Sequence, residues 1–166
     1  ESNDLLSRPV ISGFTVKPGI YRMRVAATDR VGRAGTVDQS VAVDLEKGDG
    51  PVQMSALVFG VGRGQAFVPQ LMFESETGAL GSFEVYGAPQ NSTVTAAVEI
   101  AASASGPVVA KAPARVGTPS SDGRRLALAA IPLGSLPPGD HLVRVVVSVD
   151  GKPVGRVTRT LRKTGK

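Results

Sequence analysis

The longest regular pattern along this chain is an alternation of apolar and polar residues with a period of two. Successive side chains of a β-strand point to opposite faces, so this period predicts strands that bury one face. One strand is predicted over residues 139–149, and its inward face carries His141, Val143, Val145, Val147 and Val149. A second is predicted over residues 93–102, with an inward face of Val94, Ala96, Val98 and Ile100.

Shorter alternations extend this interpretation. Leu126 and Leu128 alternate with an arginine and an alanine, and Phe83 and Val85 flank Glu84. No segment repeats apolar residues at the three- and four-residue spacing of an amphipathic helix. The chain is therefore predicted to be all-β.

Turn signals separate the predicted strands. Asp122-Gly123 and Asp150-Gly151 have the composition of tight hairpin turns, in which glycine adopts a positive φ. Pro18-Gly19 and Pro138-Gly139 each precede a predicted strand, because proline sets the first corner of a turn and glycine the second. These signals predict about ten short strands, more than the seven of a minimal immunoglobulin-type sandwich.

Residues 17–45 resemble residues 137–163 when the two segments are aligned at an offset of 120 positions without a gap. The Pro-Gly pairs coincide and the alternating faces match, with Tyr21 at the position of His141. Four further positions are identical: Arg24 and Arg144, Val25 and Val145, Gly35 and Gly155, and Val37 and Val157. A repeat at this spacing indicates the same final hairpin in two successive β-sandwich modules.

The repeat predicts two modules of unequal completeness. Residues 1–48 are predicted to be the terminal strands of a preceding, incomplete sandwich. Residues 51–166 are predicted to form a complete immunoglobulin-like or fibronectin-III-like β-sandwich. The polar residues 46–51, rich in glycine and proline, are the predicted linker. In the alternative arrangement, the N-terminal strands complete a single larger sandwich. A lone hairpin is unstable in water, so both arrangements require it to dock on something.

Composition then excludes several classes of function. The 166 residues include 20 Gly and 12 Pro, too many for a helical bundle, but no Cys and one His. These counts exclude a disulfide scaffold, a zinc ribbon, an iron–sulfur site, a thiol nucleophile and a multi-histidine metal site. We predict no catalytic residue, no metal ligand and no cofactor.

The net charge of +5 suggests nucleic-acid binding, but the charge distribution argues against it. Acidic residues are interleaved through most of the chain, and only the segment after Asp150 is purely basic. Its cations are Lys152, Arg156, Arg159, Arg162, Lys163 and Lys166. We interpret them as a solvated strand face and a frayed end, so nucleic acid is not an expected partner. No apolar run approaches the roughly 18 residues of a membrane span.

Three sequence features have residue types that support chemistry, and each has a simpler structural explanation. His141 follows a Pro-Gly corner where the repeat carries Tyr21, and a side chain there commonly hydrogen-bonds back across the corner. The glycine-rich segment 60–64 lacks the rest of a phosphate-binding motif, so it is expected to be a loop with Arg63 exposed at its tip. Residues 91–93, Asn-Ser-Thr, are a formal glycosylation sequon at a turn after Pro89, but so short a motif often arises by chance, and we give it no weight.

The carboxylates are scattered rather than paired, at Glu74, Glu76, Glu84, Glu99, Asp122, Asp140 and Asp150. A glycosidase needs two carboxylates in a cleft lined by aromatic residues. The seven aromatics are interpreted mostly as core residues: Phe14, Tyr21, Phe59, Phe67, Phe73, Phe83 and Tyr86. No Asp-x-Asp-x-Asp-Gly run of a calcium loop occurs, and Asp49-Gly50 alone indicates a turn. Glu74-Ser75-Glu76 is able to bind a cation weakly, and we interpret it as a solvated loop.

Outward-facing arginines gather on or next to the two repeated hairpins, at Arg22, Arg24, Arg144, Arg156 and Arg162. Charged residues at sheet edges mainly prevent sheets from adding to one another. A basic face that binds a partner is the alternative interpretation.

Four segments have a common resemblance: residues 17–37, 53–58, 83–87 and 131–139. They resemble the C-terminal β-rich region of bacterial "VWFA-related" proteins, which also carry a von Willebrand factor type A domain. The metal-binding Asp-x-Ser-x-Ser signature of that domain does not occur in this sequence, so the resemblance implies no metal or ligand residue. It implies an exported or envelope-associated setting. The opening residues ESND contain no start methionine or signal peptide, so the sequence is expected to be an excised piece or a mature fragment.

These observations predict a non-catalytic structural or protein-interaction module of a larger secreted or envelope-associated bacterial protein. Its expected partners are a protein or other domains of the same chain. The pattern makes no prediction of the oligomeric state. The alternative is an accessory module that binds carbohydrate or nucleic acid through an exposed sheet face. Carbohydrate binding would require aromatics clustered on one face, and nucleic-acid binding an affinity that falls with salt.

Overall fold

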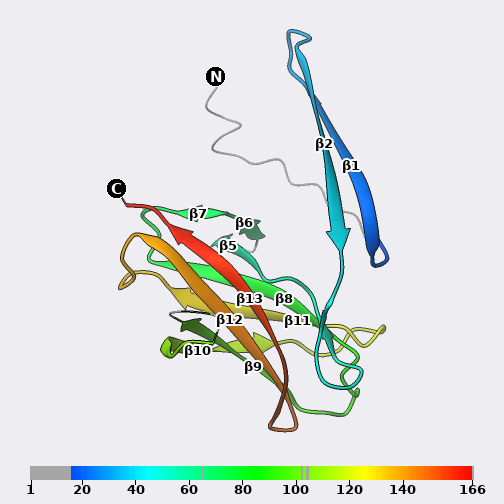
Figure 1. Cartoon of the computed structure of the whole chain (residues 1–166), viewed down its shortest axis with the longest axis vertical. Helices are drawn as coiled ribbons and strands as arrows, with labels where there is room; N and C mark the ends of the chain where they lie inside the picture. Colours follow the sequence, from blue (N-terminus) through cyan, green and yellow to red (C-terminus); the bar gives the residue numbers. More distant parts are fainter. Residues whose placement is uncertain (1–15, 65, 102, 104, 166) are drawn as a thin grey trace. The chain divides into compact units, whose positions relative to one another are not determined.

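The protein is built from β-strands, in two units. A computed structural model describes residues 16–64, 66–101, 103 and 105–165 (Figure 1). These residues contain thirteen strands and no helix, which confirms the all-β prediction. The units are Glu1–Asp44 and Leu45–Lys166. In the first, β1 (Gly19–Thr28) and β2 (Ala34–Val43) form a two-stranded antiparallel sheet.

The hairpin β1–β2 is a structural repeat of the last two strands of the chain, β12 (Gly139–Val149) and β13 (Lys152–Lys163). Nine consecutive residue pairs, from Gly19↔Val43 to Ala27↔Gly35, recur 120 positions later, from Gly139↔Lys163 to Val147↔Gly155. The predicted repeat is thus confirmed in the register of the strands. The hairpins differ only towards their tips, where β12–β13 has a register shift after Val147.

The second unit contains the remaining strands in one hydrogen-bonded sheet. The main order is β3-β4-β8-β11-β10-β9-β12-β13-β7, and β5 joins β8 and β6 beside it. The strands before β12 are β3 (Glu46–Lys47), β4 (Gln53–Met54), β5 (Val58–Arg63), β6 (Ala66–Pro69), β7 (Met72–Phe73), β8 (Gly78–Tyr86), β9 (Val94–Ala101), β10 (Val108–Val116) and β11 (Arg125–Pro132). All described pairs are antiparallel except β7 with β13.

The sheet closes over a single hydrophobic core. The inward faces of β8 and β11 on one side and of β9, β12 and β13 on the other contribute to the same cluster of buried side chains. A flat sheet cannot bring these faces together, so the two halves must face each other; β12 and β13 cross over β8 and β11 in Figure 1. Val143, Val145 and Val147 are completely buried, as the alternation predicts. Each contributes on the order of 1.5–3 kcal/mol to folding.

The strand β10 connects the two halves of the sheet. Its first part pairs with β9, from Val108 to Ala114, and its last residues pair with β11, from Ala114 to Val116. A register shift between Val108 and Ala110 lies at the start of the pairing with β9. Because β10 serves both neighbours, the core is bounded by continuous backbone hydrogen bonding from β8 through to β13.

The inward face of β11 differs from what residue size alone suggests. Leu126 and Leu128 are 50% and 38% exposed, whereas Ala127 and Ala129 are buried. The ladder with β8 explains this, because Ala127 pairs with the buried Phe83 on the same face. A slip by one residue would reverse every side chain of the strand and expose its buried isoleucine, so the long ladder decides which face turns inward.

The expected loop at residues 60–64 is instead mostly strand. Gly60 and Gly62 lie within β5, and the hairpin with β6 turns at Gly64, where φ is +61°. A Cβ atom on Gly60 would lie 2.3 Å from the carbonyl oxygen of Val68 and 2.8 Å from the ring of Phe67. Glycine is needed here for the close approach of β6, which is a packing reason rather than a phosphate-binding one.

The predicted linker, residues 46–51, contains part of the second unit. Glu46 and Lys47 form β3 and pair with Met54 and Gln53 of β4. The backbone N–H of Asp49 then donates to the carbonyl of Val154 in β13 over 2.5 Å. The division between the units falls earlier, between residues 44 and 45.

Candidate functional site

The predicted corner residues make the expected hydrogen bonds in both hairpins. Nε2 of His141 donates to the carbonyl oxygen of Pro137 over 2.8 Å, and the hydroxyl of Tyr21 donates to that of Lys17 over 2.7 Å. Each bond spans four residues and closes the Pro-Gly corner that starts the strand. His141 therefore has a structural role that accounts for its position, equivalent to that of Tyr21.

A shallow groove of about 480 Å³ lies on the outer face of β9, β12 and β13. It is lined by Asp49, Glu99, Arg144, Val146, Pro153, Val154, Gly155 and Arg156. The strand pairing explains its position, because Arg144 of β12 stands opposite Glu99 of β9, and Val146 opposite Arg156 of β13. Val154 lies at the register shift of β13, where the segment after β3 approaches.

An ion pair forms one wall of the groove. Nε of Arg144 lies 2.8 Å from Oε2 of Glu99, and Nζ of Lys111 lies 3.2 Å from Oε1. The side chains of Glu99 and Arg144 are 9% and 12% exposed, so the pair is largely shielded from water. Burial raises the pKa of the Glu99 carboxyl, but hydrogen bonds from Arg144 and Lys111 outweigh it and leave the pKa below its ordinary value.

A second polar cluster lies on the outer face of β8. Nη1 of Arg124 lies 2.6 Å from Oε1 of Glu84, and the hydroxyl of Tyr86 donates to the other carboxylate oxygen. Burial, together with the hydrogen bond to Glu84, raises the pKa of Tyr86 to about 12. The tyrosine therefore stays protonated at neutral pH and acts as a hydrogen-bond donor.

Four of the five remaining candidate carboxylates stabilise turns and hairpins. The carboxylate of Glu76 accepts from Nε2 of Gln70 over 2.7 Å, and that of Asp150 accepts from the backbone N–H of Thr93 over 2.8 Å. Asp122 lies in the β10–β11 turn, and Asp140 pairs with Arg162 over 2.7 Å. In the part of the chain that the structure describes, no three His, Cys, Asp or Glu residues come close enough to hold a metal ion.

Three of the five described cations of the basic C-terminal segment bind other groups of the protein: Arg159, Arg162 and Lys163. Nη1 of Arg159 donates to the carbonyl of Leu57 over 2.6 Å, and its guanidinium lies 5.9 Å from the ring centroid of Phe59. Nζ of Lys163 donates to the carbonyls of Leu133 and Leu136. Lys152 and Arg156 are exposed, and Lys166 lies outside the described residues.

The other arginines predicted to face outward lie in the hairpin β1–β2. Nε of Arg24 lies 2.7 Å from Oδ1 of Asp38, and Nη2 of Arg22 lies 3.0 Å from the second oxygen of the same carboxylate. One acid thus serves two cations on this face.

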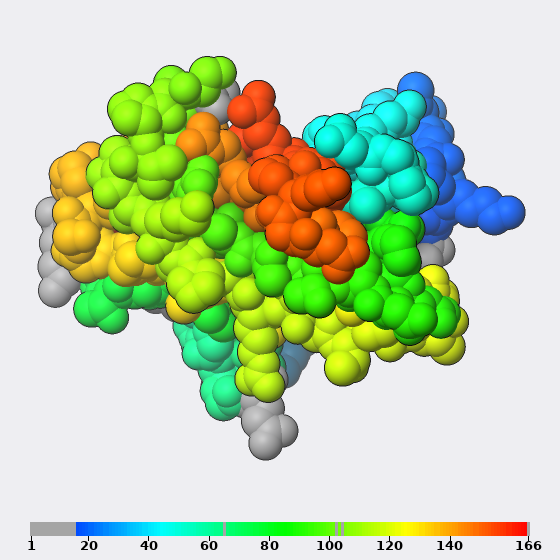
Figure 2. Space-filling model, turned by 90° about the horizontal axis from the view of Figure 1, so that it is seen from below, coloured from blue at the N-terminus to red at the C-terminus, as the bar shows by residue number. Residues whose placement is uncertain are grey.

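A buried arginine is a feature that the sequence interpretation missed. Arg125 is 7% exposed, and its Nη2 donates to the carbonyl oxygens of Pro89 and Gln90 over 3.1 and 2.9 Å. It holds the β8–β9 loop, which contains the sequon, against the start of β11. Figure 2 shows this end of the unit, with the β8–β9 loop in green beside the β12–β13 turn in orange-red. The inward alternation of β11 was the available signal, because it places this arginine on the buried face.

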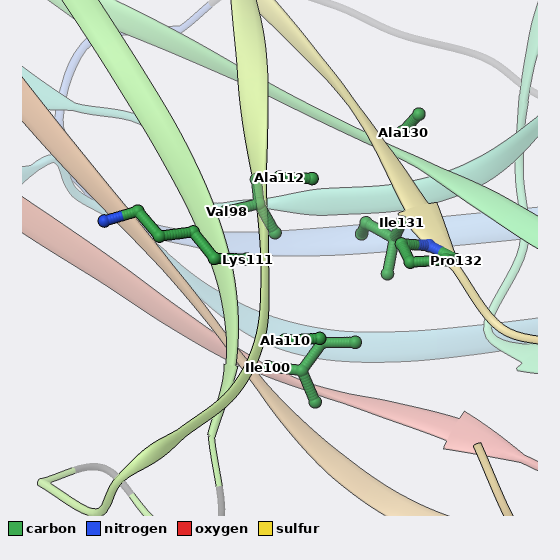
Figure 3. A pocket seen from close by; sticks show the side chains of 8 residues that line it. All are labelled: Val98, Ile100, Ala110, Lys111, Ala112, Ala130, Ile131 and Pro132. Carbon is green, nitrogen blue, oxygen red and sulfur yellow. The ribbon is translucent and has the colours of Figure 1, made fainter. Parts of the chain in front are cut away.

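One void inside the second unit is too small for a ligand. A void of about 10 Å³ between β9, β10 and β11 is lined by apolar side chains, and Lys111 at its edge directs its amine away (Figure 3). A volume of this size is at the lower limit for one water molecule. Phe59, Phe73 and Phe83 are buried, and the aromatic residues that the structure describes do not line the groove. Phe14 lies outside the described residues.

No protein-family model matches the chain, and no curated protein matches it significantly. Within residues 16–165, apart from the gaps, no helix is long and apolar enough to cross a membrane.

Proposed function

We propose that this chain is a non-catalytic β-sandwich region that serves as a structural or protein-interaction module. The observation that carries the proposal is the repeated hairpin, with the same register and the same corner hydrogen bond in two places. Repetition of a sandwich element along one chain is typical of modular proteins that space and dock other domains. His141, Glu76 and Asp150 each have a local structural partner.

The strand order supports an immunoglobulin-like topology for the second unit. If β4 and β5 are strand A and β8 to β13 are strands B to G, the observed order is A-B-E-D-C-F-G. Immunoglobulin sandwiches of constant type place A, B, E and D in one sheet and C, F and G in the other. Here strand D, which is β10, also pairs with C and joins the two halves.

The resemblance to the C-terminal region of VWFA-related proteins supports an exported or envelope-associated setting. The segment 17–37 covers β1 and the start of β2, and residues 131–139 lead from β11 into β12. In such a setting the module would present or space other domains, and its partners would be proteins or further parts of the same polypeptide.

The test of this proposal challenges the full chain with ligands of the alternative function. Thermal unfolding is followed with a soluble β-glucan, and with single-stranded DNA of about 20 nucleotides at low salt. We expect neither probe to raise the melting temperature. A rise with the glucan, or a salt-sensitive rise with DNA that Arg156→Glu abolishes, would assign the protein to ligand binding through the β9–β12–β13 face instead.

A further inference from the structure

The hairpin β1–β2 exposes a face that its repeat buries. Tyr21 and Val25 are 36% and 53% exposed, and Val37, opposite Val25, is 64% exposed. The equivalent residues of the second unit are almost or completely covered, with Val145 at 0% and Val157 at 4% exposure. The cover there is the sheet half that contains β8 and β11, and β9 adds to the edge of β12.

We propose that the apolar face and the open edge of β1–β2 receive one partner, an open apolar β-sheet that completes a second sandwich. This proposal rests on the modular function above and deepens it by stating the partner. The edge strand of the partner pairs antiparallel with β1, as β9 pairs with β12. Its face covers Tyr21, Val25 and Val37, as β8 and β11 cover the equivalent residues of β12 and β13.

Charge complementarity specifies the edge strand further. In the second unit, Arg144 of β12 stands opposite Glu99 of the neighbouring strand and pairs with it over 2.8 Å. Arg24 holds the equivalent position on β1, and it shares the single carboxylate of Asp38 with Arg22. The edge of β1 therefore carries one more cation than anion at this point, and the partner strand is expected to carry an acidic residue opposite Arg24.

The size of the required cover excludes two simpler occupants. A second hairpin packed face to face covers a face of about 33 by 10 Å but adds no strand to the edge of β1, whereas in the second unit β9 pairs along the edge of β12. The 15 residues before Val16 are also too few, because β8, β9 and β11 contain nine, eight and eight residues. A separate sheet of several strands is the occupant that fits.

The test uses the second unit as the model partner sheet. In the full chain, residues 137–163 are replaced by the sequence of residues 17–43, which has the same length and the same Pro-Gly corner. If β1–β2 fits a sheet of this kind, the grafted chain unfolds cooperatively and keeps slow hydrogen exchange in β8 and β11. Val25→Lys in the grafted copy should abolish this protection, whereas Ser40→Lys, on the opposite face of the hairpin, should preserve it.

A second set of variants tests the face and the charge without moving the chain junctions. His141→Tyr, Val143→Met and Val147→Ala together give the parent hairpin the inner residues of β1. If the triple variant and the graft both lose slow hydrogen exchange in β8, the proposal is overturned. Slow exchange that persists in either chain supports it. In the graft, Glu99→Lys should lower the melting temperature and Arg24→Glu in the grafted copy should restore it. The lack of any such coupling would contradict the acidic partner strand.

Measurements on the unmodified chain identify the other occupants. A concentration-dependent dimer that Val25→Lys dissociates would assign the face to a second copy. Protection of β1 amides that disappears when residues 1–15 are removed would assign it to that segment. Either result would overturn the partner sheet. A ligand that binds the second unit would instead overturn the proposed function and leave the graft result unchanged.

Discussion

The corner hydrogen bond is the smallest feature that the two hairpins share, and it can be tested at His141. His141→Phe keeps a ring but removes the donor to the carbonyl of Pro137. We expect a loss of about 0.5–1.5 kcal/mol in the free energy of unfolding, measured by chemical denaturation. His141→Tyr should lose much less, because Tyr21 makes the same bond in the repeat. Equal losses in the two variants would show that the bond contributes nothing.

Arg125 is expected to matter more than its exposed neighbour Arg124. Arg125→Met leaves the carbonyls of Pro89 and Gln90 without their donor, which should cost about 1–3 kcal/mol and speed hydrogen exchange in the β8–β9 loop. Arg124→Met, the matched control, breaks an ion pair with Glu84 in which the arginine is 45% exposed. Such surface pairs contribute about 0.2–1 kcal/mol. Indistinguishable melting temperatures would contradict this assignment.

The ion pair of Glu99 is expected to make the free energy of unfolding of the second unit sensitive to acid. The pKa of Glu99 is below the ordinary value in the folded protein, so the unfolded chain takes up the proton first as the pH falls. The stabilisation is present at neutral pH and is lost progressively below about pH 4. We expect Glu99→Gln to lower the stability at pH 7 and to flatten its decline towards pH 3. An unchanged pH profile in this variant would show that the pair with Arg144 does not contribute.

At the scale of strands, the period-two pattern and the Pro-Gly corners were sufficient for several elements. They located β9 and β12 with the correct inward faces, and the repeat alignment predicted that the two hairpins correspond residue by residue. They did not show β3, or the strand character of residues 60–63, because such short segments form only through their pairing partners. The groove likewise depends on Glu99 and Arg144 meeting across strands 45 residues apart, which no local pattern records.

The faces of β11 provide a test at this scale. Replacing Leu126 and Leu128 together by Ser removes the larger side chains of the strand, yet both lie on the exposed face. We expect a change of about 0.5 kcal/mol for each. Ala129→Leu adds volume on the buried face and should cost about 1–3 kcal/mol through overpacking. The reverse order of the two losses, measured by chemical denaturation, would mean that the strand is turned over.

For the molecule as a whole, the boundary between the two units can be tested with shortened chains. They show whether residues 45–50 are needed for the stability of the second unit. A chain that starts at Leu45 keeps β3 and the bond from Asp49 to Val154, so it should unfold at the same temperature as this unit in the full chain. A chain that starts at residue 51 loses these contacts. We expect it to fold with a lower melting temperature, because each lost hydrogen bond contributes roughly 1 kcal/mol.

Two controls separate this boundary from the alternative of one larger sandwich. Val25→Lys in the full chain should leave the unfolding of the second unit unchanged, because the core cluster consists of residues after Pro51. If the chain starting at Leu45 fails to fold while the full chain folds, β1 and β2 are required by the same core and the single sandwich is correct. If only the chain starting at residue 51 fails, β3 belongs to the minimal module and the boundary lies before Glu46, where the chain divides into its two units.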